Sequence, residues 1–327
     1  MKIKSIDVNQ LLLPIFQQMD EEQKPSFDRY IKYDRNNLSG HNKNRIIYAP
    51  NLAMRRIHQK LVSDLHRIRR PLPYAKGCMR NCSPIGHIAP HRHHQWFFIT
   101  DIHSAYPSVN KEKLLDLIMS FKRNPTLNDE EYNRKFLEDF CLAKEGGLAT
   151  GAPASPLLFN MYAGEFIDKA LAKLCQKFNL TYTRYLDDLV FSGLEPIGKK
   201  KRKQILNIVR SAGFEVSYHK TFYYDLKQKP ITLCGFGLEY GGRIFLPREY
   251  RQKIYHRIKE AITNHDHNFN KIAGFHGLLK LSLANHYKTG SETRILNLYR
   301  QYKLTKRKST RQKNFLTRQP PIKFGGF

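Results

Sequence analysis

Two adjacent aspartates between two apolar runs constrain this chain more than any other feature. They stand in "TRYLDDLVFSG" (residues 183–193), where Asp187 and Asp188 separate Tyr182–Tyr185 from Leu189–Ser192. Neighbouring carboxylates repel each other, and burying a charge is costly unless a cation compensates it. The flanking runs predict two strands with the aspartates at or near the turn between them. A fold that buries this turn must also bring positive charge to it.

A third carboxylate follows another strand-like run. "QWFFITDI" (95–102) is a continuous apolar stretch that reaches Asp101, which predicts a buried strand ending in an acid. Such a strand beside the hairpin could gather three carboxylates. Oxygen ligands of this kind suit Mg²⁺, with Mn²⁺ as an alternative, and two ions about 3.5–4 Å apart serve phosphoryl transfer. An Asp-Asp pair in a loop is more often a solvated turn, so the surrounding residues must decide.

The overall charge points to a polyanionic partner. Lys and Arg number 56 against 28 Asp and Glu, a net charge of +28, which favours nucleic acid. A merely basic or ribosome-associated protein is the alternative. The chain lacks an apolar run long enough for a membrane span, and its start turns acidic without a cleavage site. Five cysteines without regular spacing favour reduced thiols. We therefore expect a cytoplasmic protein without membrane contact.

Periodicity predicts most of the remaining elements. A strand and a Pro turn precede a basic amphipathic helix in 41–70, and Gly-Gly marks a hairpin in 231–247. The last 25 residues carry many Lys and Arg and no acid, so we expect them to be mobile or to fold on a polyanion. Further helices are predicted in 111–145, 155–178, 199–212 and 248–300.

Segments between residues 44 and 239 resemble the reverse transcriptase family, in the family's order. In chain order they are "NRIIYAPNLAMRRI" (44–57, fingers), "FFITDIHSAYPSV" (97–109, motif A), "GLATGAPASPLLFN" (147–160, motif B), "YLDD" (185–188, motif C), "AGFEVSYHKT" (212–221, motif D) and "TLCGFGLE" (232–239, the primer-grip hairpin).

The resemblance implies an α+β fold of the right-hand polymerase type, with fingers, a palm built on an antiparallel sheet with helices, and a small helical thumb. The implied domains are fingers and N-terminal region (1–94), palm (95–242, with part of the fingers inserted near 111–147), helical thumb (243–302) and basic C-terminal tail (303–327).

The resemblance also implies the metal ligands. Asp101 and Asp187 would bind the metal ions, with Asp188 as a closely coupled third carboxylate. The backbone carbonyl of Ile102 would add an oxygen. The alternative for Asp101 is an N-cap or ion-pair role.

A second group of residues would bind the incoming nucleotide. Tyr106 stands where the family blocks the ribose 2′-hydroxyl, which implies dNTP use; a core tyrosine is the alternative. Gly151 would let the backbone approach the nucleotide. Thr150 departs from the family's usual Gln. Arg45 would neutralise the triphosphate, with Arg55 or Arg56 as alternatives. Lys220 would act as an acid or a charge stabiliser toward pyrophosphate. A solvated lysine is the alternative for Lys220.

A third group would contact template or primer. Tyr185 and Leu186 would lie beneath and near the primer end, and Cys234 and Gly235 belong to the primer-grip segment. Asn160 is expected on a helix face near the template, with a capping role in the core as the alternative.

The chain resembles retron reverse transcriptases in size and layout, although two retron boxes are degraded. "HIAPH" (87–91) keeps only the final histidine of one box, and "LCG" (233–235) replaces the other. Cys78 and Cys82 with the two histidines loosely imitate a zinc site, but structural zinc ligands usually come in tighter pairs. The length left after motif D favours a compact retron, diversity-generating or phage-defence polymerase, and Ser155-Pro156 argues against the diversity-generating type.

The implied function is RNA-directed DNA synthesis from dNTPs, with a cognate non-coding RNA as template partner in a retron-like or anti-phage system. Template-independent or protein-primed DNA synthesis and a catalytically idle RNA-binding protein are the alternatives. A protein effector or a homo-oligomer is left open as a further partner.

Overall fold

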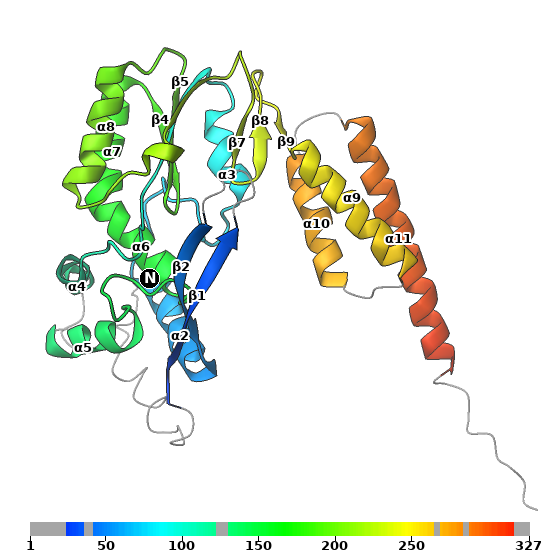
Figure 1. Cartoon of the computed structure of the whole chain (residues 1–327), viewed down its shortest axis with the longest axis horizontal. Helices are drawn as coiled ribbons and strands as arrows, with labels where there is room; N and C mark the ends of the chain where they lie inside the picture. Colours follow the sequence, from blue (N-terminus) through cyan, green and yellow to red (C-terminus); the bar gives the residue numbers. More distant parts are fainter. Residues whose placement is uncertain (1–23, 36–41, 122–129, 265–268, 284–287, 317–327) are drawn as a thin grey trace, which may run out of the picture. The chain divides into compact units, whose positions relative to one another are not determined.

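The computed structural model describes residues 24–35, 42–121, 130–264, 269–283 and 288–316 (Figure 1). The chain divides into two compact units between Asp225 and Leu226. Each unit is described by itself. The expectations for the start of the chain and for the last residues of the basic tail lie outside the described residues.

A four-stranded antiparallel sheet is the centre of the first unit, in the order β4-β5-β3-β6. The predicted strand of motif A is β3, and it has a partner on each side, which suits its continuous apolar sequence. The predicted hairpin around the aspartates is formed by β4 and β5. The strand bounds are β3 (Trp96–Asp101), β4 (Thr181–Tyr185), β5 (Asp188–Gly193) and β6 (Phe222–Asp225).

The two faces of this sheet have different neighbours. Side chains alternate along a strand, so Tyr182 and Arg184 share one face with Leu189 and Phe191. This face packs on the helical layer that includes α7 and α8 (Figure 1). The layer consists of α6 (Ser155–Ala163), a π-helical turn η4 (Gly164–Asp168), α7 (Lys169–Phe178) and α8 (Lys199–Ser211). The prediction of one helix over 155–178 is confirmed, with a π turn in its middle.

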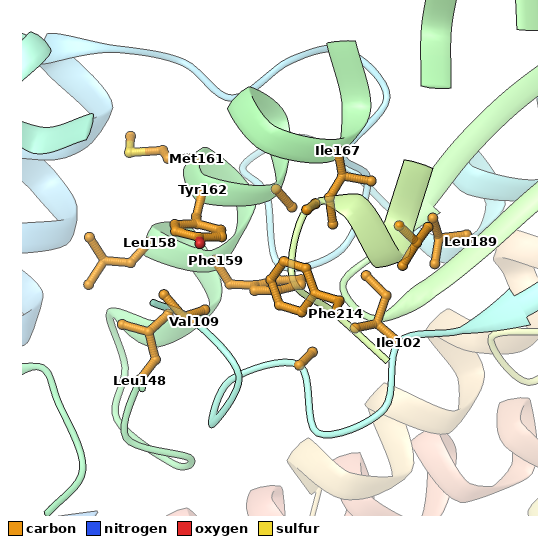
Figure 2. Packing of buried hydrophobic residues seen from close by; sticks show 14 of the residues in the cluster. Ile102, Val109, Leu148, Leu158, Phe159, Met161, Tyr162, Ile167, Leu189 and Phe214 are labelled. Atoms are coloured by element: carbon orange, nitrogen blue, oxygen red, sulfur yellow. The ribbon is translucent and has the colours of Figure 1, made fainter. Parts of the chain in front are cut away.

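The core lies between the sheet and these helices. Figure 2 shows Phe159 of α6 close to Phe214, together with Leu189 of β5 and Ile102 after β3. Phe159 meets Tyr106 and Phe214 edge-on, with ring centroids 5.5 Å and 6.1 Å away. The catalytic motifs thus contribute directly to the apolar core.

A separate two-stranded sheet precedes the palm. β1 (Phe27–Arg35) pairs with β2 (Asn42–Pro50), and α2 (Leu52–Ile68) follows, capped by the Asn51 side chain, which accepts from Met54 N at 2.9 Å. The sequence predicted β2 and α2 but not β1. The other short helices here are α3 (Pro84–Ile88), η2 (Ala89–His91), α4 (Lys111–Ser120), α5 (Glu130–Phe140) and η5 (Tyr218–Lys220).

The second unit contains a three-stranded sheet, β7-β8-β9, and three helices. The predicted hairpin over 231–247 is confirmed as β8 and β9, joined through Gly241 and Gly242. The expected thumb boundary at residue 302 falls inside a helix, because α11 continues through much of the basic tail. The bounds are β7 (Ile231–Leu233), β8 (Phe236–Leu238), β9 (Ile244–Phe245), α9 (Arg248–Thr263), α10 (Phe269–Ser282) and α11 (Gly290–Leu316).

Apolar spacing explains why α11 packs on its neighbours. Ile295, Tyr299 and Tyr302 recur on one face of the helix and are buried, and the Tyr299 ring stacks on His276 of α10 at 3.8 Å. None of the helices in the described part of the chain is long and apolar enough to cross a bilayer.

Candidate active site

The three predicted aspartates come together at the ends of β3 and β5. Asp101 is paired with Asp188 across the two strands, and directly opposite residues of an antiparallel pair share one face. Asp187 lies in the turn, and its carbonyl accepts a hydrogen bond from Ile102 N at 2.9 Å. A predicted strand and a predicted hairpin therefore deliver carboxylates to one place.

Lys220 and Ser217 hold the carboxylate of Asp101. Lys220 Nζ donates to Oδ1 at 2.7 Å, and Ser217 Oγ donates to Oδ2 at 2.7 Å. Asp101 is almost fully buried, whereas the Lys220 side chain is 40% exposed. Motif D thus supplies a cation to motif A, and the serine is a partner that the sequence analysis missed.

The carboxylate cluster carries more negative charge than its neighbours compensate. Burial, and then the charge of Asp101, raise the pKa of Asp187 above its usual value. Burial, followed by the charges of Asp187 and Asp101, raises the pKa of Asp188. Lys220 opposes both shifts without cancelling them. Such a cluster of oxygen ligands fits a hard divalent cation.

The three aspartates are not arranged around one common metal position in this structure. Within the described ranges, no three Asp, Glu, His or Cys side chains form a ready set of metal ligands. Both oxygens of Asp101 are engaged by Lys220 and Ser217. A metal ion that binds Asp101 would share its carboxylate with these two donors, because an ionised carboxylate has about four lone-pair sites.

A pocket of 420 Å³ lies beside the aspartates. Arg45 of β2 lines it together with Ile102, Tyr106, Thr150 and Asp187. Most of the residues expected to bind the nucleotide therefore share one cavity. Lys220 does not line it and reaches the cluster through Asp101 instead.

Motif B is fastened to the β1–β2 sheet. Tyr48 N donates to the carbonyl of Thr150 at 2.8 Å. Gly151 has a φ of +105°, and a Cβ there would lie 2.9 Å from the Tyr48 carbonyl oxygen. Glu145 accepts hydrogen bonds from Tyr48 and, at 3.1 Å, from Arg29. Tyr48, Glu145 and Thr150 also line the pocket beside the aspartates, so these contacts, which need glycine at position 151, lie in its wall.

Tyr106 has features both of a core tyrosine and of a residue that lines the pocket. Its ring is partly buried and packs on Phe159, and burial raises the pKa of its hydroxyl. It also lines the nucleotide pocket. Both placements are therefore present, and the steric role at the sugar stays a prediction.

The residues expected to contact primer and template lie in different places. Tyr185 and Leu186 lie in the catalytic hairpin, with Leu186 in the pocket wall. Asn160 is fully buried, and its side chain bonds to Gly77 and Arg184. These contacts lie within the core, as in the alternative weighed for this residue, and a contact with template stays a prediction.

Cys234 and Gly235 are in the second unit, in the turn that joins β7 to β8. Both have positive φ, 47° and 82°, as a two-residue hairpin turn of this type requires. The expected hairpin is present, and its contact with primer stays a prediction.

The "HIAPH" segment supports the catalytic hairpin from the face that carries Asp188. The two ring nitrogens of His91 lie 2.6 Å from Ser192 Oγ and 2.7 Å from Thr183 Oγ1. His87 Nδ1 lies 2.8 Å from the same threonine.

The zinc alternative has little support in this arrangement. Both cysteines of the loop, Cys78 and Cys82, are exposed, whereas His87 and His91 are buried and bonded to strand hydroxyls.

The comparisons with known proteins agree with this geometry. The model of the family described as "Reverse transcriptase (RNA-dependent DNA polymerase)" matches residues 32–238. This chain belongs to the reverse transcriptase family. The match covers every motif from the β1–β2 sheet to β8.

Similar proteins include retron reverse transcriptases. The reverse transcriptase of retron Mx65 from Myxococcus xanthus is 26% identical to this chain, over 54% of this chain and 44% of the length of that protein. The one of retron Ec73 from Escherichia coli is 26% identical over 55% of this chain and 60% of its own. The matches thus span about half the length of these curated relatives. Telomerase from Candida albicans is structurally similar at a TM-score of 0.46 and 11% identity, over 89% of this chain and 58% of that one.

The sequence analysis missed three polar residues beneath this reverse transcriptase site. Ser217 was passed over because its hydroxyl has no motif signature. Arg184 and Asp168 are a fully buried ion pair, 2.8 Å apart. A charged residue inside an apolar strand was a usable signal for Arg184, since buried charges are paired.

Proposed function

We propose that this reverse transcriptase family member is an RNA-directed DNA polymerase that uses dNTPs and two divalent metal ions. The observation that supports this best is the pairing of Asp101 with Asp188, beside a pocket that Asp187 and Ile102 line. A merely structural acid would have no need of two buried carboxylate neighbours with raised pKa values.

The chain's own residues divide the work. Asp101, Asp187 and Asp188, with the Ile102 carbonyl, would hold Mg²⁺ or Mn²⁺. When bound, such ions supply Lewis-acid stabilisation of the attacking and leaving oxygens. Arg45 would bind the triphosphate.

Two further residues select and stabilise the nucleotide. Tyr106, as part of the pocket wall, would exclude a nucleotide that carries a ribose 2′-hydroxyl. Lys220, which donates a hydrogen bond from Nζ to Asp101, would stabilise the pyrophosphate charge.

The proposed partner is a cognate non-coding RNA that serves as template, in a bacterial retron-like or anti-phage defence system. Similarity to retron reverse transcriptases supports this, as does the net charge of +28. Binding to RNA should weaken steeply with salt, because bound cations leave the phosphates on association.

Template-independent or protein-primed synthesis is the second candidate. The short side chain of Thr150, which lines the nucleotide pocket where the family usually has Gln, favours it. An idle RNA-binding protein is disfavoured by the complete acid set.

Sequencing the nucleic acid that co-purifies with wild-type protein and with an Asp187→Asn, Asp188→Asn double variant tests the proposal. The wild type should carry DNA complementary to one RNA, and extend it with dNTPs and Mg²⁺, whereas the double variant should carry RNA alone. DNA unrelated to any RNA present, or DNA attached to a tyrosine, would favour the second candidate. Equal DNA synthesis by the double variant would overturn the assignment.

A further inference from the structure

The residue next to the tyrosine of the catalytic turn is a fully buried arginine. Arg184 and Asp168 are both 0% exposed. Arg184 Nε donates to Asp168 Oδ1 at 2.9 Å, and Nη2 donates to Oδ2 at 2.8 Å. Removing two charges from water is costly, and apolar residues of similar volume often stabilise a core as well. This ion pair therefore calls for a role besides stability.

The guanidinium group has an acceptor for every one of its N–H donors. Nη1 donates to Asn160 Oδ1 at 2.9 Å and to the Leu186 carbonyl at 3.0 Å, and the second bond of Nη2 is to the Asn160 carbonyl at 3.4 Å. Tyr182 Oη donates to Asp168 Oδ1 at 2.7 Å. Because Arg carries five donors in a rigid fork, its orientation is fixed by these partners.

One of those acceptors belongs to the strained residue of the turn. Leu186 has a φ of +58°, in the left-handed region. It is the first of the two residues between β4 and β5, a position where a positive φ normally calls for glycine. Strain of this kind persists only where surrounding contacts enforce it. The Arg184 bond to the Leu186 carbonyl is such a contact.

A second contact holds the turn from outside. Asn160 Nδ2 donates to the Gly77 carbonyl at 2.8 Å, and Lys76 N donates to the Arg184 carbonyl at 2.8 Å. These bonds lay the segment around Gly77 along β4. A Cβ on Gly77 would lie 2.8 Å from Leu186 N, so the two backbones are in close contact.

We propose that Asp168, Arg184 and Asn160 form a positioning network, whose task is to hold Leu186 in its left-handed conformation and so aim Asp187 and Asp188. Asp187 follows directly, and its carbonyl is bonded to Ile102 N. The orientation of the peptide between Leu186 and Asp187 thus sets the direction in which both carboxylates leave the backbone. The inference rests on the proposed polymerase function, in which these carboxylates bind metal.

Asn160→Ala tests the network, because it removes the bonds to Gly77 and Nη1 of Arg184 and keeps the ion pair. We expect kcat for primer extension to fall about 10- to 100-fold, since small misplacements of reacting groups are costly. The KM for dNTP should not change, because Asn160 does not line the pocket. Hydrogen exchange at the Ile102 amide should accelerate while core strand amides stay protected.

Adding Leu186→Gly to Asn160→Ala gives the deciding comparison. Glycine adopts a positive φ without strain. Because Leu186→Gly also removes a side chain from the pocket wall, Leu186→Gly alone is the reference, and adding Asn160→Ala to it should lower kcat far less than Asn160→Ala does in the wild type. Ser282→Ala is the matched control: it removes a buried hydroxyl that donates to Leu279 O at 2.8 Å in the second unit. It should leave kcat and the exchange of the Ile102 amide unchanged.

The outcomes separate the claims. General loss of amide protection in Asn160→Ala, with an equal loss of kcat in the Leu186→Gly background, would make the network merely structural and overturn the inference. If Asn160→Ala does not fold, Gly77→Ala displaces the turn sterically and leaves the polar network intact. The same loss of kcat and the same faster exchange of the Ile102 amide are expected. Wild-type values for both would overturn the inference. A wild type without polymerase activity would refute the proposed function, while Ile102 exchange would still test the positioning.

Discussion

Lys220 Nζ lies 2.7 Å from Asp101 Oδ1, so a lysine of motif D neutralises the carboxylate that motif A contributes to the site. Lys220 and a divalent ion are both cations suited to this carboxylate. In the proposed function, a divalent ion at Asp101 would weaken the hold of this carboxylate on the lysine.

Lys220→Gln should make the protein more dependent on metal. Without the lysine charge, repulsion among the buried carboxylates is relieved only by protons or by a bound ion. We expect a lower melting temperature than wild type in EDTA and a larger rise on adding Mn²⁺. Differential scanning fluorimetry measures both, with the exposed Lys229→Gln as the control. An unchanged response to Mn²⁺ would mean that Lys220 does not compete for the site.

Tyr106→Ala should relax discrimination between dNTPs and rNTPs. The ring lines the nucleotide pocket, and its removal makes room for a 2′-hydroxyl. We expect the ratio of kcat/KM values for dNTP and rNTP to fall by about 10-fold or more, since a lost steric barrier of about 1.4 kcal/mol already gives a factor of ten. Tyr106→Phe keeps the ring and should keep the ratio. Equal discrimination by the Ala and Phe variants would contradict the prediction.

Gly151→Ala should weaken nucleotide binding more than it slows chemistry. The added Cβ meets the Tyr48 carbonyl at 2.9 Å in a backbone conformation with φ +105°, so the β1–β2 sheet must shift away from motif B. Arg45 moves with that sheet. Steady-state kinetics should show a higher KM for dNTP. Gly146→Ala also has a positive φ but an unobstructed Cβ, and a KM closer to that of wild type is expected.

Stability should fall in mild acid because of the histidines behind the hairpin. Burial lowers the pKa of His87 from 6.5 to about 4, and burial also lowers the pKa of His91 well below its usual value. The unfolded chain therefore binds more protons, so the contribution of His87 is complete above about pH 6.5 and declines as pH falls toward 4. At about 1.4 kcal/mol per pKa unit it amounts to about 3 kcal/mol.

Urea unfolding between pH 4.5 and 7.5 measures this slope. His87→Asn retains a polar atom near that of Nδ1, which faces Thr183 Oγ1, and does not titrate. Its unfolding free energy should depend less on pH. A slope equal to that of wild type would assign the acid sensitivity to other groups.

The elements that carry motifs could be predicted from sequence because their signals are local. The strand before Asp101 and the hairpin around Asp187 follow from apolar runs of the right length. β1 was missed because its pattern has charges and aromatics on both faces, with Tyr30 and Tyr33 exposed. Burial in this sheet is confined to one end, around Tyr48, so most of the strand has no buried face to impose alternation.

The contacts beneath the site could not be predicted, because they join residues far apart in the chain. The resemblance to known polymerases placed Asn160 near the template, and only the fold shows its amide between Gly77 and Arg184. His91 was recognised as part of a degraded box, but its bonds to two strand hydroxyls depend on tertiary packing.

The π turn between α6 and α7 has a consequence for how this enzyme tolerates insertions and deletions. The wide turn Gly164–Asp168 adds one residue to the helical repeat and brings Asp168 under Arg184. Deleting one residue within it would restore the regular α-helical repeat and shift the residues of the turn, Asp168 among them, by about one position relative to their surroundings. The helix alone would be more regular, yet the aspartate would turn away and leave a buried guanidinium uncompensated. The length of this helix is therefore as important to the buried ion pair as the identity of its side chains.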